Sequence, residues 1–215
     1  MFRDRREAGE RLADRLAGLE DIRERDVTVL GIPRGGVVVA DEVAERLAAP
    51  LDVVIPRKLG APGNPELAIG AVAPGQRVLD ERMVRALGVP ESYLDREVAR
   101  AEQEIERRER RYRAGLPPLE LNDRTAIVVD DGVATGSTAV AALRWARARG
   151  AAAVVLGVPV APAPTARQLA READEVLALE TPDLFHAVGQ WYRHFGQVSD
   201  DEVVRILERR SSVAS

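Results

Sequence analysis

The chain has 215 residues, of which 46% are hydrophobic, so it is long enough to bury the core of one globular domain. Its formal net charge is −4, with acidic and basic residues interleaved, which excludes a basic polyanion-binding surface, and we expect no nucleic-acid partner. The chain has no cysteine, which rules out disulfides and thiolate metal sites, and no apolar run long enough for a membrane span, so we predict a cytoplasmic protein with no membrane partner.

The first predicted elements alternate between helix and buried strand. Residues 4–19 carry apolar side chains at helical spacing and predict an amphipathic helix that only packs on one face of a sheet. A strand over 27–32 precedes a helix over 37–48, and another strand covers 51–55. Between the first strand and its helix lies the segment 34–36, Arg-Gly-Gly, at the carboxyl end of a strand, where open α/β sheets bind ligands.

Two cations and a glycine- and proline-rich stretch follow the strand that ends at residue 55. Arg57 and the only lysine, Lys58, would neutralise a ligand with several negative charges, or form a solvated basic turn. Residues 59–66 have the composition of a mobile lid loop. Short strands over 67–72 and 77–79 are predicted to form a hairpin beside it.

The second half of the chain continues the alternation. Helices are predicted over 81–87 and 91–113, and the second is charged almost all round, so we expect a partly exposed covering helix. Strands over 152–158 and 176–179 flank a helix that begins at Pro162 and Pro164. Strands alternating with helices predict an α/β fold with a doubly wound parallel sheet and right-handed crossovers.

The segment 185–195 concentrates the scarce aromatic residues, just before a last predicted helix over 200–209. Its aromatic and histidine residues are Phe185, His186, Trp191, Tyr192, His194 and Phe195. Aromatic faces can stack a nucleobase, and they can equally form a hydrophobic cluster that anchors the C-terminal segment. The sequence leaves both functions open and does not single out one ring.

The chemistry centres on the loop that follows a buried strand over 127–129. The strand ends at Asp130 and Asp131, which a buried strand could not carry further. A small-residue loop with two glycines then leads into a helix predicted over 139–149, which the Ser-Thr pair at 137–138 is placed to cap. Loop N–H groups and the helix dipole favour a phosphate there. The adjacent carboxylates suit sugar hydroxyls, with a divalent metal nearby.

Common phosphate-binding and hydrolase motifs are missing from the chain. The loop has neither the Gly-Lys-Ser/Thr of a Walker A motif nor a GxGxxG, and the chain contains no HExxH or GxSxG. Residues 127–138 instead resemble, residue for residue, the phosphoribosyl pyrophosphate signature of type I phosphoribosyltransferases. The shared pattern is an apolar strand, two acids, three variable residues, Thr-Gly, a small or hydroxyl residue, and Thr. The resemblance covers about residues 25–180 and points to bacterial phosphoribosyltransferases of unassigned acceptor.

This resemblance implies an enzyme of nucleotide metabolism that moves 5-phosphoribosyl from phosphoribosyl pyrophosphate to a nucleobase-like nitrogenous acceptor, with Mg²⁺ and release of pyrophosphate. It places the ribose hydroxyls on Asp130 and Asp131, which would hold the metal indirectly, through ligand or water. The 5-phosphate and ribose would contact the loop residues Gly132, Val133, Ala134, Thr135, Gly136, Ser137 and Thr138. Pyrophosphate would contact Arg34, Gly35 and Gly36, and its developing charge would be met by Arg57 and Lys58. Such a pyrophosphate loop often contains a cis peptide, so we predict a cis Pro33–Arg34 bond.

The resemblance also bears on acceptor, organisation and assembly. Hypoxanthine-guanine enzymes usually carry an aspartate where this chain has Ala134, so a 6-oxopurine acceptor is disfavoured. We expect a single domain over 1–215, with its core at about 25–180, a small hood or lid at about 57–80, and a C-terminal aromatic segment and helix at 181–210. Related enzymes are often dimers, which implies a homodimer.

Two alternative functions would use the same predicted phosphoribosyl pyrophosphate pocket. One is a non-enzymatic regulator that senses phosphoribosyl pyrophosphate, although the chain shows neither a basic nucleic-acid face nor an appended DNA-binding unit. The other is a hydrolase or phosphorylase that acts on a ribosyl phosphate at the same site.

Overall fold

The computed structural model describes residues 1–114 and 118–213, and its centre is a five-stranded, all-parallel sheet in the order β2-β1-β6-β7-β8. The strands are β1 (Val27–Gly31), β2 (Leu51–Val53), β6 (Thr125–Val129), β7 (Ala153–Val160) and β8 (Glu175–Glu180). All residues of β1, β6 and β7 are buried, as expected for a sheet covered on both faces. The predicted parallel α/β sheet is confirmed.

Alternate residues of each strand pack into two separate cores, one on each face of the sheet. Val29 and Ile127 face one core, and Leu30 and Val128 face the other. On the first face lie α1 (Arg5–Ala17), α2 (Glu20–Arg23), α3 (Gly35–Arg46) and α8 (Asp200–Val213). On the second lie α6 (Ser137–Ala148) and α7 (Ala163–Leu169). The predicted N-terminal helix is confirmed as a covering helix, slightly shorter than expected because Gly18 ends it.

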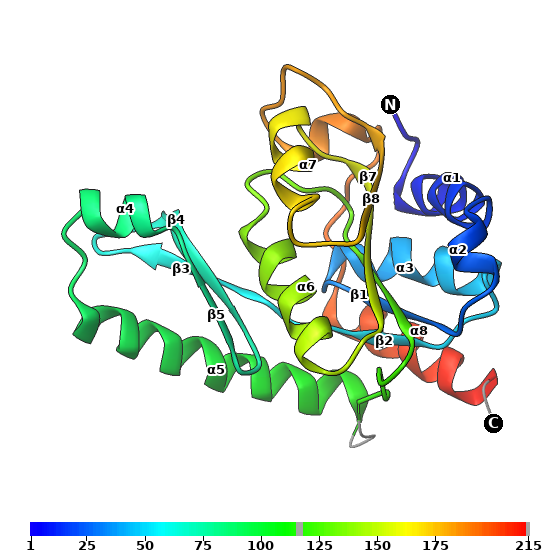
Figure 1. The fold of residues 1–215 in the computed structure, drawn as a ribbon, viewed down its shortest axis with the longest axis horizontal. Helices are drawn as coiled ribbons and strands as arrows, with labels where there is room; N and C mark the ends of the chain where they lie inside the picture. The colour runs from blue at the N-terminus through cyan, green and yellow to red at the C-terminus, as the bar shows by residue number, and fades with distance from the viewer. Residues whose placement is uncertain (115–117, 214–215) are drawn as a thin grey trace.

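Residues 57–113 form an arm that extends sideways from the sheet (Figure 1). It consists of an antiparallel sheet of β3 (Arg57–Ala61), β4 (Asn64–Ala73) and β5 (Gln76–Leu79), with helices α4 (Glu81–Ala86) and α5 (Glu91–Arg113). The predicted hairpin is confirmed. The expected lid loop at 59–66 was wrong, because β3 and β4 extend to a tight turn around Gly63, whose φ of +75° suits glycine.

Helix α5 is the partly exposed covering helix predicted from its charges. Its narrow buried face includes Leu94, Ala101, Ile105 and Tyr112. The Tyr93 hydroxyl donates to the Gly60 carbonyl at 3.0 Å, and the Tyr112 hydroxyl donates to Asp200 at 2.6 Å. The helix therefore ties the arm to the start of α8.

The N-terminal residues lie against the segment that follows β8. Phe2 is fully buried and forms a parallel bridge with Tyr192, next to the short 3-10 helix η1 (Val188–Trp191). The Phe2 N–H donates to the Trp191 carbonyl at 2.7 Å, and the Arg193 N–H donates to the Phe2 carbonyl at 2.9 Å. In the part of the chain that the structure describes, no helix has both the length and the apolar character that a bilayer crossing requires.

Candidate active site

The pairing of β1 with β6 brings the two predicted ligand loops together. The strands are parallel neighbours with Gly31 opposite Val129, so the segments after them leave the same sheet edge. The Ile32 N–H donates to the Val129 carbonyl at 2.8 Å, which extends the pairing by one residue. The Pro33–Arg34 peptide bond that follows is cis, as predicted.

Two glycines allow these loops to touch. A Cβ atom on Gly35 would lie 1.9 Å from Oδ2 of Asp131, far inside any real contact distance. A Cβ atom on Gly36 would lie 2.8 Å from both the Asp130 Cα and the Val129 carbonyl oxygen. Glycine is therefore required at position 36 by contact with backbone atoms, and at position 35 a side chain would displace the Asp131 carboxylate, so the loop at 34–36 rests directly on the acid pair.

The acid pair is electrostatically unusual. The Asp131 N–H donates to Oδ1 of Asp130 at 2.8 Å. Burial, reinforced by the negative charge of Asp131, raises the pKa of Asp130 well above its ordinary range. The positive charge of Lys58 acts in the opposite direction and lowers this pKa. Lys58 thus acts electrostatically on Asp130, as its position after β2 led us to expect.

Arg5 contacts the acid pair from the N-terminal helix, which sequence reasoning had assigned to packing alone. Its Nε donates to Oδ2 of Asp131 at 2.7 Å, and both side chains are largely buried, 11% and 16% exposed. The Tyr192 hydroxyl also reaches this residue and donates to the Asp131 carbonyl at 2.5 Å. No local signal distinguishes Arg5 in a chain with 31 basic residues, because its role depends on a partner 126 positions away.

The loop after Asp131 ends in a helix N-terminus with a free hydroxyl inside it. Gly136, at φ +84°, is the N-cap of α6 and makes no side-chain cap bond, so the expected Ser-Thr cap was wrong: Ser137 is already the first helical residue. Among the described residues, the buried Ser137 Oγ has no hydrogen-bond partner. Such an orphaned donor beside exposed helix N–H groups fits a phosphate oxygen.

Other members of the predicted loop have different surroundings. Val133 is 3% exposed and its N–H donates to the Val160 carbonyl at 2.9 Å, so both its side chain and its donor serve the fold. The Ala134 carbonyl accepts a hydrogen bond from Oγ1 of Thr165 at 2.8 Å, while its side chain is exposed, as is that of Thr135. The part of the loop that is left to bind a ligand is therefore residues 134–138.

Asp131 also lines a cavity of about 430 Å³. Its lining includes both Arg5 and Arg34, together with Asp131. Arg34 is 35% exposed and its Nη1 lies 3.8 Å from Asp200. Arg57, the other predicted cation, begins β3 opposite Val72 and is half-buried. The structure therefore places Arg34 and Gly35 beside Asp131 and adds Arg5 to them, while Lys58 acts on Asp130 only through its charge.

The donor atoms present fit a Mg²⁺ ion that is carried mainly by a ligand. Within residues 1–114 and 118–213, no group of three or more His, Cys, Asp or Glu side chains forms a protein-only cage. Mg²⁺ usually keeps several waters and binds through one or two carboxylates together with substrate phosphates. Asp130 and Asp131 supply such a carboxylate pair.

In the aromatic segment 185–195, some rings are buried and anchor the segment, and others are partly exposed. Tyr192 is 5% exposed and lies 5.4 Å from the Phe2 ring, centroid to centroid, so it anchors the segment. Phe195 stacks on Tyr192 at 5.0 Å and lies over the Arg5 guanidinium at 3.8 Å. Leu184, by contrast, is 81% exposed and Phe185 half-buried.

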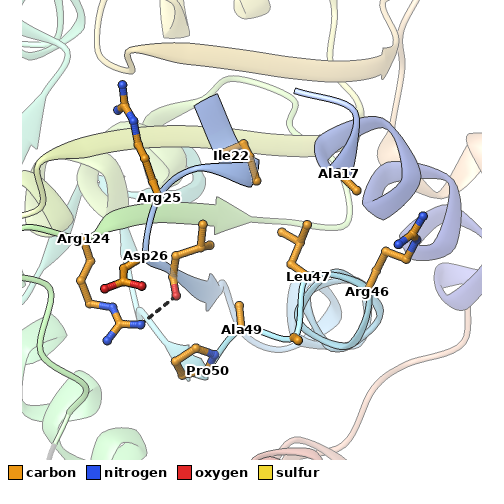
Figure 2. A pocket seen from close by; sticks show the side chains of 11 residues that line it. Ala17, Ile22, Arg25, Asp26, Arg46, Leu47, Ala49, Pro50 and Arg124 are labelled. Carbon is orange, nitrogen blue, oxygen red and sulfur yellow. Dashed lines mark hydrogen bonds between the residues drawn. The ribbon is translucent and has the colours of Figure 1, made fainter. Parts of the chain in front are cut away.

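A second pocket, of about 390 Å³, lies at the amino-terminal edge of the sheet (Figure 2). Arg124 donates there to the Val27 carbonyl at 3.2 Å, beside the Asp26 carboxylate and the carboxyl end of α3 at Leu47. This pocket faces away from the carboxyl ends of the strands, where the predicted ligand residues gather.

Several known proteins are similar to this chain in sequence and in fold. A family model for the phosphoribosyl transferase domain matches residues 5–192. Proteins of Mycobacterium tuberculosis strains CDC 1551 / Oshkosh and H37Rv, named provisionally as phosphoribosyl transferases, are 50% identical over 210 residues, 97% of this chain. The chain spans only 47% of the length of these relatives.

The crystal structure of TT1426 from Thermus thermophilus is 48% identical and superposes with a TM-score of 0.80, covering 97% of this chain and 98% of that one. Sequence and fold therefore agree with the resemblance carried by the loop at 127–138. The chain belongs to the phosphoribosyl transferase domain family.

Proposed function

We propose that this protein transfers the 5-phosphoribosyl group of phosphoribosyl pyrophosphate to a ring nitrogen of a nucleobase-like acceptor, with Mg²⁺ and release of pyrophosphate. The observation that carries the proposal is the contact between the glycine pair at 35–36 and the acid pair at 130–131. It joins a loop suited to pyrophosphate and a loop suited to ribose 5-phosphate into one site. The unpartnered Ser137 hydroxyl at the far end supports the phosphate assignment.

Each group has a role that its position supports. Asp130 and Asp131 accept hydrogen bonds from the ribose hydroxyls and hold Mg²⁺ through the ligand or water. Residues 134–138 bind the 5-phosphate with backbone N–H groups and hydroxyls. The pyrophosphate lies at Arg34, Gly35 and Gly36, where Lys58 and Arg57 balance its charge.

The reaction is a displacement at C1 of the ribose. The bond to the acceptor nitrogen forms as the C1–O bond to pyrophosphate breaks, pyrophosphate leaves with the bonding electrons, and the acceptor nitrogen gives up its proton. A transition state with oxocarbenium character places positive charge on the sugar and extra negative charge on the leaving group. The protein therefore contributes orientation and charge compensation.

The acceptor is expected between the ribose and the segment after β8. Ala134 stands where a carboxylate would exchange a proton with a 6-oxopurine, so we expect adenine-like or pyrimidine-like acceptors to react better than hypoxanthine or guanine. Tyr192 is buried against Phe2, so we expect another ring of the segment 185–195 to stack the acceptor.

Pyrophosphate release from phosphoribosyl pyrophosphate, followed with Mg²⁺ and a panel of nucleobases, tests the proposal. Release that depends on one class of base supports it. Tight donor binding without turnover for any base would instead indicate a sensor of phosphoribosyl pyrophosphate. Turnover that needs no base would indicate a hydrolase or phosphorylase.

The variant Asp130→Asn separates loss of the site from loss of the fold. A carboxyl whose pKa is raised by folding stabilises the protein fully only below its ordinary pKa of 3.8, and this contribution is lost as pH rises through the folded pKa. Asparagine stays neutral, so we expect Asp130→Asn to be about 1–2 kcal/mol more stable than the native protein at neutral pH, and equal to it in acid. Donor binding, measured by calorimetry, should nevertheless be lost. Unchanged donor affinity would reject the assignment.

A further inference from the structure

We infer that Arg5, supplied by the N-terminal helix, is a further pyrophosphate-binding residue of the site, which this structure holds ready through an ion pair with Asp131. The inference rests on the proposed function and adds a residue to it. Arg5 enters the site from outside the segments that carry the motifs, so neither the loop at 127–138 nor the loop at 34–36 predicts it.

Three contacts fix the Arg5 guanidinium at the edge of the cavity. Nε donates to Oδ2 of Asp131 at 2.7 Å, and Nη1 donates to the Gly196 carbonyl at 2.7 Å. The Phe195 ring lies 3.8 Å from the guanidinium carbon, which holds the plane of the group by cation–π contact. An arginine held in this way loses little further conformational entropy when it binds a ligand.

The fixed guanidinium keeps donors available for an anion. Of its five N–H groups, the hydrogen bonds to described residues engage two. Arg5 and Arg34 line the same cavity, about 430 Å³ in volume, next to Gly35. A Cβ atom on Gly35 would lie 2.7 Å from the Arg5 Nε, so Arg5 directly adjoins the loop proposed to bind pyrophosphate.

Charge explains why a second arginine is needed there. Asp131 brings a negative charge to the site, and Arg34 lies 3.8 Å from a second carboxylate, that of Asp200. A diphosphate brought next to these carboxylates is repelled unless cations outweigh them. Arg5 first neutralises Asp131. When the sugar hydroxyls donate to that carboxylate, the remaining N–H groups of the fixed Arg5 guanidinium can donate to the diphosphate, an anion that arginine is well suited to bind.

Calorimetric titration of native protein and of Arg5→Gln with two probes, inorganic pyrophosphate and ribose 5-phosphate, both with Mg²⁺ present, tests the inference. Loss of a charge-assisted contact should weaken pyrophosphate binding about tenfold to a hundredfold. Ribose 5-phosphate should bind as well as before or more tightly, because Asp131 then keeps both oxygens for the hydroxyls. Arg5→Lys, which retains the charge but not the fork, should weaken pyrophosphate binding by a smaller factor and serves if Arg5→Gln fails to fold.

The control variant is Arg46→Gln, which breaks an exposed ion pair with Asp14 at the other edge of the sheet and should change neither titration. Equal weakening of both probes in the Arg5 variants would overturn the inference, since it would show a purely structural contact, and so would unchanged pyrophosphate affinity. In either case the proposed function stands. Native protein that binds neither probe would overturn both.

Discussion

At the scale of single residues, some buried hydroxyl groups have no hydrogen-bond partner among the described residues. The Ser137 hydroxyl lies in the candidate site, and the Thr28 hydroxyl is fully buried within β1, in the sheet. A buried hydroxyl without a partner costs free energy in the folded state, so its removal does not weaken the fold. The two residues differ in location, because only Ser137 starts a helix beside the acid-pair loop.

We predict that Ser137→Ala leaves the free energy of unfolding unchanged or slightly higher, and lowers the affinity for ribose 5-phosphate by about 1.5–3 kcal/mol, the range for a hydrogen bond to a charged group. Thr28→Val is the matched control, since it removes an unpartnered hydroxyl inside the sheet and should preserve affinity. Urea denaturation and calorimetric titration measure the two quantities. Undiminished affinity in Ser137→Ala would remove the serine from the phosphate site.

At the scale of elements, one of the contacts that join α5 to α8 titrates at both ends. The hydrogen bond from Tyr112 lowers the pKa of Asp200, and burial, together with this bond, raises the pKa of Tyr112 to about 12. The Asp200 contribution to stability is present above its ordinary pKa of 3.8 and is lost as pH falls through the lower folded value. The Tyr112 contribution is present below its ordinary pKa of 10.0 and is lost as pH rises toward 12.

Tyr112→Phe should therefore lower the free energy of unfolding by about 1–3 kcal/mol between pH 4 and pH 10, and by less outside that range. Tyr93→Phe is the comparison on the same helix, because its hydroxyl donates to a backbone carbonyl that does not titrate. Its effect should be smaller, and it should stay constant as pH falls below 4, where the effect of Tyr112→Phe decreases. Denaturant midpoints of both variants, measured across a series of pH values, test this prediction. If the loss in free energy of unfolding followed the same pH profile in both variants, the prediction would be contradicted.

At the scale of the whole molecule, the N-terminal residues and the segment after β8 close over the site together. Phe2 packs under Tyr192, Tyr192 donates to Asp131, and Phe195 covers Arg5. The position of the acid pair therefore depends on contacts between residues that lie far apart in the sequence.

Phe2→Ala should destabilise the protein by about 3–5 kcal/mol, the usual cost of a large cavity at a fully buried phenylalanine. It should also weaken pyrophosphate binding at temperatures where the variant is still folded, because Tyr192 and Phe195 lose their support. Phe2→Leu, which fills most of the space, should keep the affinity while losing less stability. Native pyrophosphate affinity in a folded Phe2→Ala protein would show that the contact of Phe2 with Tyr192 does not position the site.

The sequence predicted the strands, the helices and the two loops of the site from local signals. Runs of buried β-branched residues marked β1, β6 and β7, and an acid pair or a glycine pair marked the points where β6 and β1 end. The same local reasoning failed at residues 59–66, where glycine and proline permit a tight hairpin turn as readily as a loop. It also failed at Ser137, because composition does not show whether Gly136 or the serine ends the loop.

The sequence by itself predicted the parallel α/β order from its alternating strand and helix patterns, and it predicted the loop at 127–138 and the cis bond before Arg34 through its resemblance to type I phosphoribosyltransferases. Only the tertiary structure decided that Gly35 and Gly36 rest on the acid pair, that Tyr192 anchors rather than stacks, and that Arg5 reaches Asp131. These contacts join residues up to 190 positions apart, as in the pairing of Phe2 with Tyr192, and arginine occurs at many surface positions. The packing of the helices around the sheet determines which of these distant residues come into contact, and no local sequence pattern predicts those contacts.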